Sequence, residues 1–214
     1  MRSTSTHALY LSTSVLALSL VAILASPANA QSPSGPFQLT SSTFTKGSTL
    51  PISMIRNLVE NGVNVCSIDG STGGNESPEL SWTNAPARTQ TFVVVLYDTT
   101  AAFTHWGMYN IAATETGLPQ NAGVAGSTYG SQIFNDFFIA PEYDGPCPPV
   151  GVAPYAHHYV FTVYALDTTL RLPGSRNFPA SAETLYHALI AAGRHHHILA
   201  SASLLGLYST TTGK

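Results

Sequence analysis

The sequence predicts a mainly β protein of the α+β class, a sandwich of sheets with short helices at its C-terminal end. Three segments, residues 91–97, 106–111 and 159–166, are rich in β-branched and aromatic residues and are the clearest strands. Helical spacing of apolar residues appears only after residue 180. A chain in which helices follow the strands, instead of alternating with them, is typical of the α+β class.

The first thirty residues have the pattern of a secretory signal peptide. Arg2 supplies the positive start, residues 9–24 form the apolar centre, and Ala28-Asn29-Ala30 is a cleavage signal of small residues. The apolar centre is short for a membrane span, so a membrane anchor is the less favoured alternative. We expect cleavage after Ala30, a single mature domain of residues 31–214 without an integral membrane segment, and a secreted or periplasmic location.

The chain carries little charge. Charged residues make up 9% of it, against roughly 25% in a typical soluble domain. The few Lys and Arg residues are scattered, so the sequence offers no basic surface for nucleic acid or an anionic membrane. An anion site in this protein is therefore expected to be local.

The remaining segments before residue 143 predict weaker elements. Residues 31–50 are expected to form a loose tail that leads into an early strand, and residues 51–61 fit a strand or a short helical turn. A turn at residues 73–75 precedes a short strand at residues 80–82. Residues 112–142, rich in Gly, Asn, Ser and Thr, are expected to be mostly loop.

The C-terminal part is expected to contain two helices. Ser181 followed by Glu183 marks a helix start, and Gly193 is expected to cap its end. A second helix is expected over residues 198–205. The three consecutive histidines at residues 195–197 cannot converge on one ion, because neighbouring residues of a helix point about 100° apart; no metal site is predicted there.

The segment of residues 143–161, YDGPCPPVGVAPYAHHYVF, is typical of a binding loop that leads into a strand. Its prolines and glycines make a stiff loop whose backbone can approach a ligand closely. In the strand that follows, His157 and Tyr159 share one face and His158 takes the other. A second candidate pair is Asp98, which ends a strand, and His105, which opens the next.

Asp98 alone would more often cap a turn, but a carboxylate near an imidazole fixes its tautomer and raises its pKa, which favours a pocket. We expect Asp98 to form a hydrogen bond with a histidine. Trp106, beside His105, is more typical of a core residue. Neither pocket segment contains Lys or Arg, so positive charge is expected to come only from His105 and His157. Binding of a phosphate ligand is then expected to strengthen from about pH 8 to about pH 6.

Four motifs occur in one order: SPELSW at residues 77–82, Asp98 to His105-Trp106, GPCPP at residues 145–149 and HHYVFTVYALD at residues 157–167. In this order the chain resembles the phosphatidylethanolamine-binding protein family, and in particular its bacterial, Raf kinase inhibitor-like branch, over residues 73–208. The resemblance implies a central β-sandwich with short flanking helices and a ligand pocket. It implies these pocket residues: Asp98, His105 and His157, with Pro148, Pro149 and Tyr159 at the rim or wall.

The chain departs from the family pattern in two places. Thr-Thr-Ala-Ala follows Asp98 where the family often has Pro-Asp-Ala-Pro, and His158 stands where the family commonly has Arg. The loss of both prolines bears on which ligand is bound more than on whether a pocket exists, whereas His158 points away from His157 and is expected behind the pocket residues or at the surface.

The predicted function is that of an exported binding protein, without cofactor or metal, for phospholipid head groups or other small phosphate-bearing molecules. One alternative is a hydrolase that uses Asp98, His105 and His157 as acid and base. Another is a protease-inhibitor or protein-interaction module, as known for members of the family. No nucleophile elbow or P-loop occurs in the sequence, which favours binding. Zinc on the same three residues is possible but less favoured.

Two further expectations concern the whole fold. Cys66 and Cys147 are the two cysteines of an exported chain, which predicts a disulfide that ties two loops near the pocket; two buried free thiols are the alternative. Val94 and Val163 are expected in the core, whereas alanine at Asp98 or His105 is expected to abolish ligand capture and leave the fold nearly intact.

Overall fold

The structure is a computed structural model that describes residues 35–175 and 179–211. The predicted signal peptide and its cleavage site lie outside these residues and stay predictions. Within the described ranges, no helix is long and apolar enough to cross a membrane.

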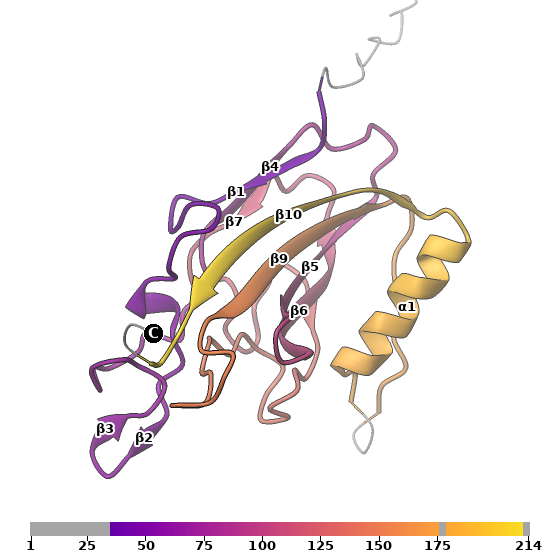
Figure 1. The fold of residues 1–214 in the computed structure, drawn as a ribbon. Coiled ribbons are helices and arrows are strands. Elements are labelled where there is room, and N and C mark those ends of the chain that lie inside the picture. Colours follow the sequence, from indigo (N-terminus) through magenta and orange to yellow (C-terminus); the bar gives the residue numbers. More distant parts are fainter. Residues whose placement is uncertain (1–34, 176–178, 212–214) are drawn as a thin grey trace, which may run out of the picture. The chain divides into compact units, whose positions relative to one another are not determined.

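The strands form two larger antiparallel sheets and a small hairpin (Figure 1). The five-stranded sheet has the order β10-β9-β5-β6-β8, with β5 (Thr91–Asp98), β6 (Phe103–Ala112), β8 (Ser131–Gln132), β9 (His157–Leu166) and β10 (Ile198–Tyr208). The three-stranded sheet has the order β1-β4-β7, with β1 (Gln38–Thr40), β4 (Leu80–Thr83) and β7 (Gly117–Leu118). Strands β2 (Val59–Glu60) and β3 (Val63–Asn64) form the hairpin.

These bounds confirm the predicted strands, although β6 begins three residues earlier than expected. Residues 51–61 take both expected forms in part, because they contain the 3₁₀ turn η1 (Ile52–Met54) and enter β2. Residues 112–142 are mostly loop and include the two-residue strands β7 and β8.

The main core lies between the two larger sheets. Trp82 of β4 packs against Phe92 of β5, with ring centroids 5.0 Å apart. Val94 and Val163 lie opposite each other on β5 and β9, and both are fully buried, as predicted. Burial of such side chains is the dominant favourable term in folding.

Helix α1 (Ala182–Arg194), the one α-helix of the described residues, is capped at its start by Ser181 and Thr184. The Ser181 hydroxyl accepts a hydrogen bond from the Thr184 amide, and the Thr184 hydroxyl accepts one from the Ser181 amide. The predicted start is confirmed, but the predicted end is wrong: Gly193 lies inside the helix and His195 is the C-cap. His196 takes the left-handed conformation (φ 58°) that often ends a helix, so no glycine is needed there.

The predicted second C-terminal helix is wrong, since residues 198–205 belong to strand β10. β10 pairs with β9 from Ile198 opposite Leu166 to Tyr208 opposite His157. Ala, Ser and Leu suit a helix locally, but the pairing with β9 satisfies the backbone and places Leu204 and Tyr208 in the core. The described residues therefore form an α+β sandwich with the single α-helix α1 in its C-terminal part.

Candidate functional site

Four of the predicted site residues come together at one end of three inner strands of the five-stranded sheet, β5, β6 and β9. β5 ends at Asp98, which lies opposite Tyr159 near the start of β9, and His105 lies near the start of β6. Because these strands are antiparallel neighbours, the end of one meets the beginnings of the others. Asp98, His105, His157 and Tyr159 are all buried.

Asp98 forms the hydrogen bond with a histidine that the sequence predicted, and the partner is His157. His157 Nδ1 lies 2.5 Å from Asp98 Oδ2. Asp98 Oδ1 accepts the backbone amides of Thr100 at 2.8 Å and Ala101 at 3.2 Å. The carboxylate thus caps the turn after β5 and also fixes the proton of His157 on Nδ1.

His105 has a different environment, because aromatic rings surround it. Its Nδ1 donates to the backbone carbonyl of Asp144 at 2.9 Å, and its ring lies 4.9 Å from Phe103, 5.5 Å from Phe137 and 5.3 Å from Tyr159 between centroids. Burial lowers the pKa of His105 from 6.5 to about 4, against the smaller opposing effects of the Asp144 carbonyl and the Asp98 charge. His105 is therefore neutral at pH 7, which corrects the expectation that it supplies positive charge.

Tyr159 completes the buried cluster. Its ring is stacked on that of His157, with centroids 6.3 Å apart. Burial, together with the charge of Asp98, raises the pKa of Tyr159 well above its ordinary value. Its phenol keeps its proton and remains a hydrogen-bond donor.

Sequence reasoning missed a cation beside this cluster. The Arg56 guanidinium carbon lies 3.7 Å from the centroid of the Phe137 ring, and Arg56 Nε lies 3.7 Å from Asp144 Oδ1. Asn135 Nδ2 donates to the other Asp144 oxygen at 2.9 Å. Phe137 and Asp144 both contact His105, so the expectation that positive charge near the site comes only from histidines is wrong. The carboxylate of Asp144, which directly precedes the GPCPP motif, was the sequence feature that could have indicated a nearby cation.

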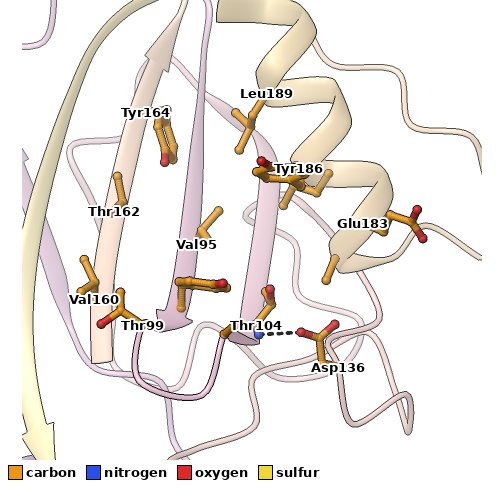
Figure 2. A pocket seen from close by; sticks show the side chains of 14 residues that line it. Val95, Thr99, Thr104, Asp136, Val160, Thr162, Tyr164, Glu183, Tyr186 and Leu189 are labelled. Carbon is orange, nitrogen blue, oxygen red and sulfur yellow. Dashed lines mark hydrogen bonds between the residues drawn. The ribbon is translucent and has the colours of Figure 1, made fainter. Parts of the chain in front are cut away.

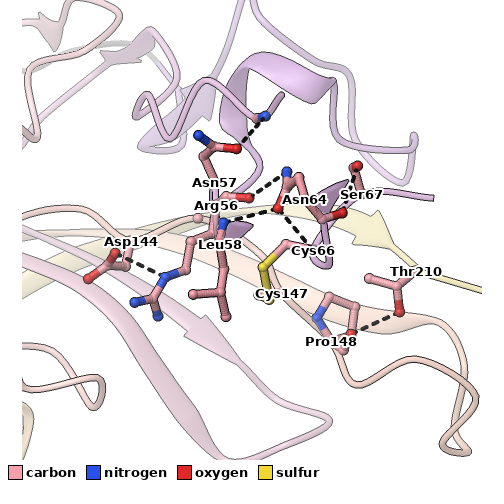
Figure 3. Close-up of a disulfide and its surroundings, with 12 residues drawn as sticks. Arg56, Asn57, Leu58, Asn64, Cys66, Ser67, Asp144, Cys147, Pro148 and Thr210 are labelled. Carbon is pink, nitrogen blue, oxygen red and sulfur yellow. Dashed lines mark hydrogen bonds and ion pairs between the residues drawn. A yellow bond between two sulfur atoms is a disulfide. The ribbon is translucent and has the colours of Figure 1, made fainter. Parts of the chain in front are cut away.

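The loop that carries Asp144 is fastened at several points (Figure 3). Cys66 and Cys147 form a disulfide, as predicted, across a sequence separation of 81 residues. The Gly145 amide donates to Asn75 Oδ1 at 2.7 Å. Pro148 is buried and its carbonyl accepts the Thr210 hydroxyl at 2.8 Å, whereas Pro149 is exposed. The place of the two prolines at the rim of the site stays a prediction.

The neighbouring residues behave as the strand alternation predicts. His158 is exposed on the other face of β9, with Nδ1 3.2 Å from the Thr100 hydroxyl. Trp106 is fully buried in the core, and its indole donates to Gln132 Oε1 at 2.6 Å.

Of the three consecutive histidines, His197 pairs with Asp167 at 2.9 Å. Among residues 35–175 and 179–211, no three His, Cys, Asp or Glu side chains are grouped as a metal ion would require.

Comparison with known proteins agrees with the resemblance seen in the motifs. A sequence model described as phosphatidylethanolamine-binding protein matches residues 40–209, which is most of the chain. The chain belongs to the phosphatidylethanolamine-binding protein (PEBP) family.

Relatives within the PEBP family are found in bacteria and archaea. The UPF0098 protein YbcL of Escherichia coli is 39% identical over 140 residues, covering 62% of this chain and 69% of YbcL. A UPF0098 protein of Methanothermobacter thermautotrophicus is 38% identical over 142 residues, covering 64% of this chain and 84% of that protein.

Solved PEBP structures share the fold. The crystal structure of E. coli YbcL, described as a new member of the mammalian PEBP family, matches with a TM-score of 0.66 and 32% identity, over 82% of this chain and 99% of that one. A putative PEBP homologue, CT736 of Chlamydia trachomatis, matches with a TM-score of 0.61 and 26% identity, over the same shares. The chain is thus a ligand-binding protein of the PEBP kind.

Proposed function

We propose that this protein binds a phosphate-bearing ligand, either a phospholipid head group or a small phosphorylated molecule, at the cluster of Asp98, His105, His157 and Tyr159. The observation that carries the proposal is the buried pair of Asp98 and His157. With Nδ1–H held by the carboxylate, a protonated His157 presents Nε2–H as a charge-assisted donor for a phosphate oxygen. Protonation of His157 and anion binding then favour each other.

His105 complements this donor. Its Nδ1 proton is engaged by the Asp144 carbonyl, so in the neutral ring Nε2 is an acceptor. Such an acceptor suits the hydroxyl of a singly charged phosphate monoester or the ammonium group of ethanolamine. Arg56 adds a positive charge to the surroundings, partly offset by its pairing with Asp144.

The test is calorimetric titration of the exported protein with phosphoethanolamine, a monoester, and glycerophosphoethanolamine, a diester, at pH 6, 7 and 8. Alanine at Asp98 would leave two amides and a histidine without their partner, because Asp98 is buried, so the variant used is Asp98→Asn. We expect binding roughly tenfold weaker in Asp98→Asn, since loss of one charge-assisted bond costs about 1.4 kcal/mol or more. His158→Asn, one residue away on the opposite face of β9, is the matched control and should bind as the unchanged protein does.

The two ligands separate the possible sources of phosphate. We expect both ligands to bind more tightly at pH 6 than at pH 8. The increase should be larger for the monoester, because its singly charged form has a P–OH group that donates a hydrogen bond to His105 Nε2. Affinity that is flat with pH, or unchanged in Asp98→Asn, would remove the Asp98–His157 pair from ligand binding. Steady turnover of either ligand would indicate a hydrolase instead, and a protein-sized adduct in native mass spectrometry would indicate a protein-interaction module.

We also propose that the protein is exported by its N-terminal segment, which the composition and the disulfide support. N-terminal sequencing of the protein recovered outside the cytoplasm is expected to begin at Gln31. A chain that retains Met1 would contradict the proposal.

A further inference from the structure

A cavity of about 600 Å³ lies between helix α1 and the face of the five-stranded sheet that the helix covers (Figure 2). The sheet forms its floor, through side chains that share one face of β5 and β9, among them Val95 and Val160. The helix forms the opposite wall, which includes Leu189. None of the four residues of the buried polar cluster lines it. Cavities of this size are typical of sites for small organic ligands.

The cavity exists because the helix is seated on only part of the sheet. At Gly107 of β6 a side chain would meet Ile133 and Leu185 at 2.7 Å, so the helix approaches the sheet closely there. Farther along β5 and β9, Val95, Val160 and Leu189 are only half-buried. These apolar side chains form an uncovered surface that a ligand with an apolar body would bury.

Among residues 35–175 and 179–211, the charged residues that line the cavity are Asp136 and Glu183, and neither a Lys nor an Arg of these ranges lines it. Asp136 is held by the Thr104 amide, which donates to its Oδ2 at 2.7 Å, and Glu183 lies in the first turn of α1. The nearby His187 ring is 3.8 Å from Glu183, but both side chains are mostly exposed, so this pair is weak.

The start of α1 can in principle attract an anion through its backbone amides, but two of these amides already have hydrogen-bond partners. The Ala182 amide donates to the Phe134 carbonyl at 3.0 Å, and the Thr184 amide donates to the Ser181 hydroxyl. Amides that already have partners are not available to an anionic ligand. The cavity therefore favours a positively charged ligand.

Tyrosine rings on both walls agree with that charge. Tyr164 extends from the sheet and Tyr186 from the helix (Figure 2), and Tyr97 of β5 also lines the cavity. The face of a tyrosine ring attracts an ammonium group, and alkylammonium ions are recognised in this way. Carboxylates, tyrosine faces and an apolar floor in one cavity match a molecule that has a cationic head and an apolar body.

We propose that the cavity beneath α1 is a second binding site, for a hydrophobic ammonium ion such as an alkylamine or alkyltrimethylammonium. The cationic head lies near Asp136, Glu183 and the tyrosines, and the alkyl body lies along Val95 and Val160. This proposal does not depend on phosphate binding at the Asp98–His157 pair.

The experiment is calorimetric titration of the whole exported protein at pH 7 with octyltrimethylammonium, octyl sulfate and octan-1-ol, each below its micelle-forming concentration or solubility limit. The three probes share one alkyl chain and differ in charge. We expect saturable binding of the cation, with affinity roughly two- to thirtyfold above that of the alcohol and higher still relative to the sulfate, because two exposed carboxylates attract the cation and repel the sulfate.

Three variants locate the binding. Glu183→Gln, on an exposed side chain, is expected to weaken cation binding roughly two- to fivefold. Val160→Trp fills the floor and is expected to abolish binding of the cation and the alcohol together. Glu60→Gln, an exposed carboxylate on β2 away from the cavity, is the matched control and should have no effect.

Octyl sulfate that binds as tightly as the cation would overturn the proposal, as would the absence of saturable cation binding. Cation binding that survives in Val160→Trp, in protein with an unchanged melting temperature, would place the ligand elsewhere and overturn it as well. A dimer in sedimentation that dissociates in Val160→Trp, with no cation bound, would show that a second copy occupies the cavity.

Discussion

The neutral, buried His105 predicts a specific loss of stability in mild acid. Its pKa is about 4 in the folded protein and about 6.5 when the chain is unfolded. Above pH 6.5 the ring is neutral in both states, so protonation has no effect on stability. As the pH falls from 6.5 to 4, the unfolded chain takes up a proton that the folded protein does not, and the folded state loses stability.

The magnitude follows from these two pKa values. One pKa unit corresponds to about 1.4 kcal/mol, so the full loss from this residue is about 3 kcal/mol. Between pH 7 and pH 4.5, most of that loss, roughly 2 kcal/mol, has already occurred. The ring is buried, so solvent screening reduces this figure little. A loss of this size is a large part of the about 5–15 kcal/mol that stabilises a typical domain.

The assay is urea unfolding with the disulfide intact at pH 7, 6, 5 and 4.5, for the unchanged protein and for His105→Asn. The Asn amide can donate to the Asp144 carbonyl as Nδ1 does, but it does not titrate. The other titratable groups are the same in both proteins, so the difference between their unfolding free energies reports on His105. We expect that difference to shift by roughly 2 kcal/mol in favour of His105→Asn from pH 7 to pH 4.5. Parallel pH profiles would refute the conclusion that burial keeps His105 neutral.

Two further predictions concern the loop that carries Asp144. Replacing Cys66 and Cys147 together by Ala should lower the unfolding free energy by on the order of 4 kcal/mol, because the bond closes a long loop; a loss below about 1 kcal/mol in chemical unfolding would contradict this. Gly145→Ala should destabilise the protein by about 2 kcal/mol or more, because its side chain would collide with the Met54 carbonyl. Gly145→Ala with the melting temperature of the unchanged protein would show that this backbone contact can relax.

The sequence by itself determined the features that depend on local backbone geometry. Alternation along a strand placed His157 and Tyr159 inside and His158 outside, because successive side chains of a strand point to opposite faces. Ser181 marked the start of α1 because its hydroxyl caps the first turn. The motif order indicated the family, and the presence of two cysteines in a chain expected to be exported indicated the disulfide.

Only the tertiary structure decided the features that depend on neighbours distant in the chain. Residues 198–205 form a strand because β9 is beside them to accept the pairing, which overrides their helical propensity. Arg56 reaches the site from a segment that the sequence left undecided. His105 is neutral because residues from three separate segments remove water from its ring, and the charge of a histidine depends on that surrounding, which no local pattern in the chain contains.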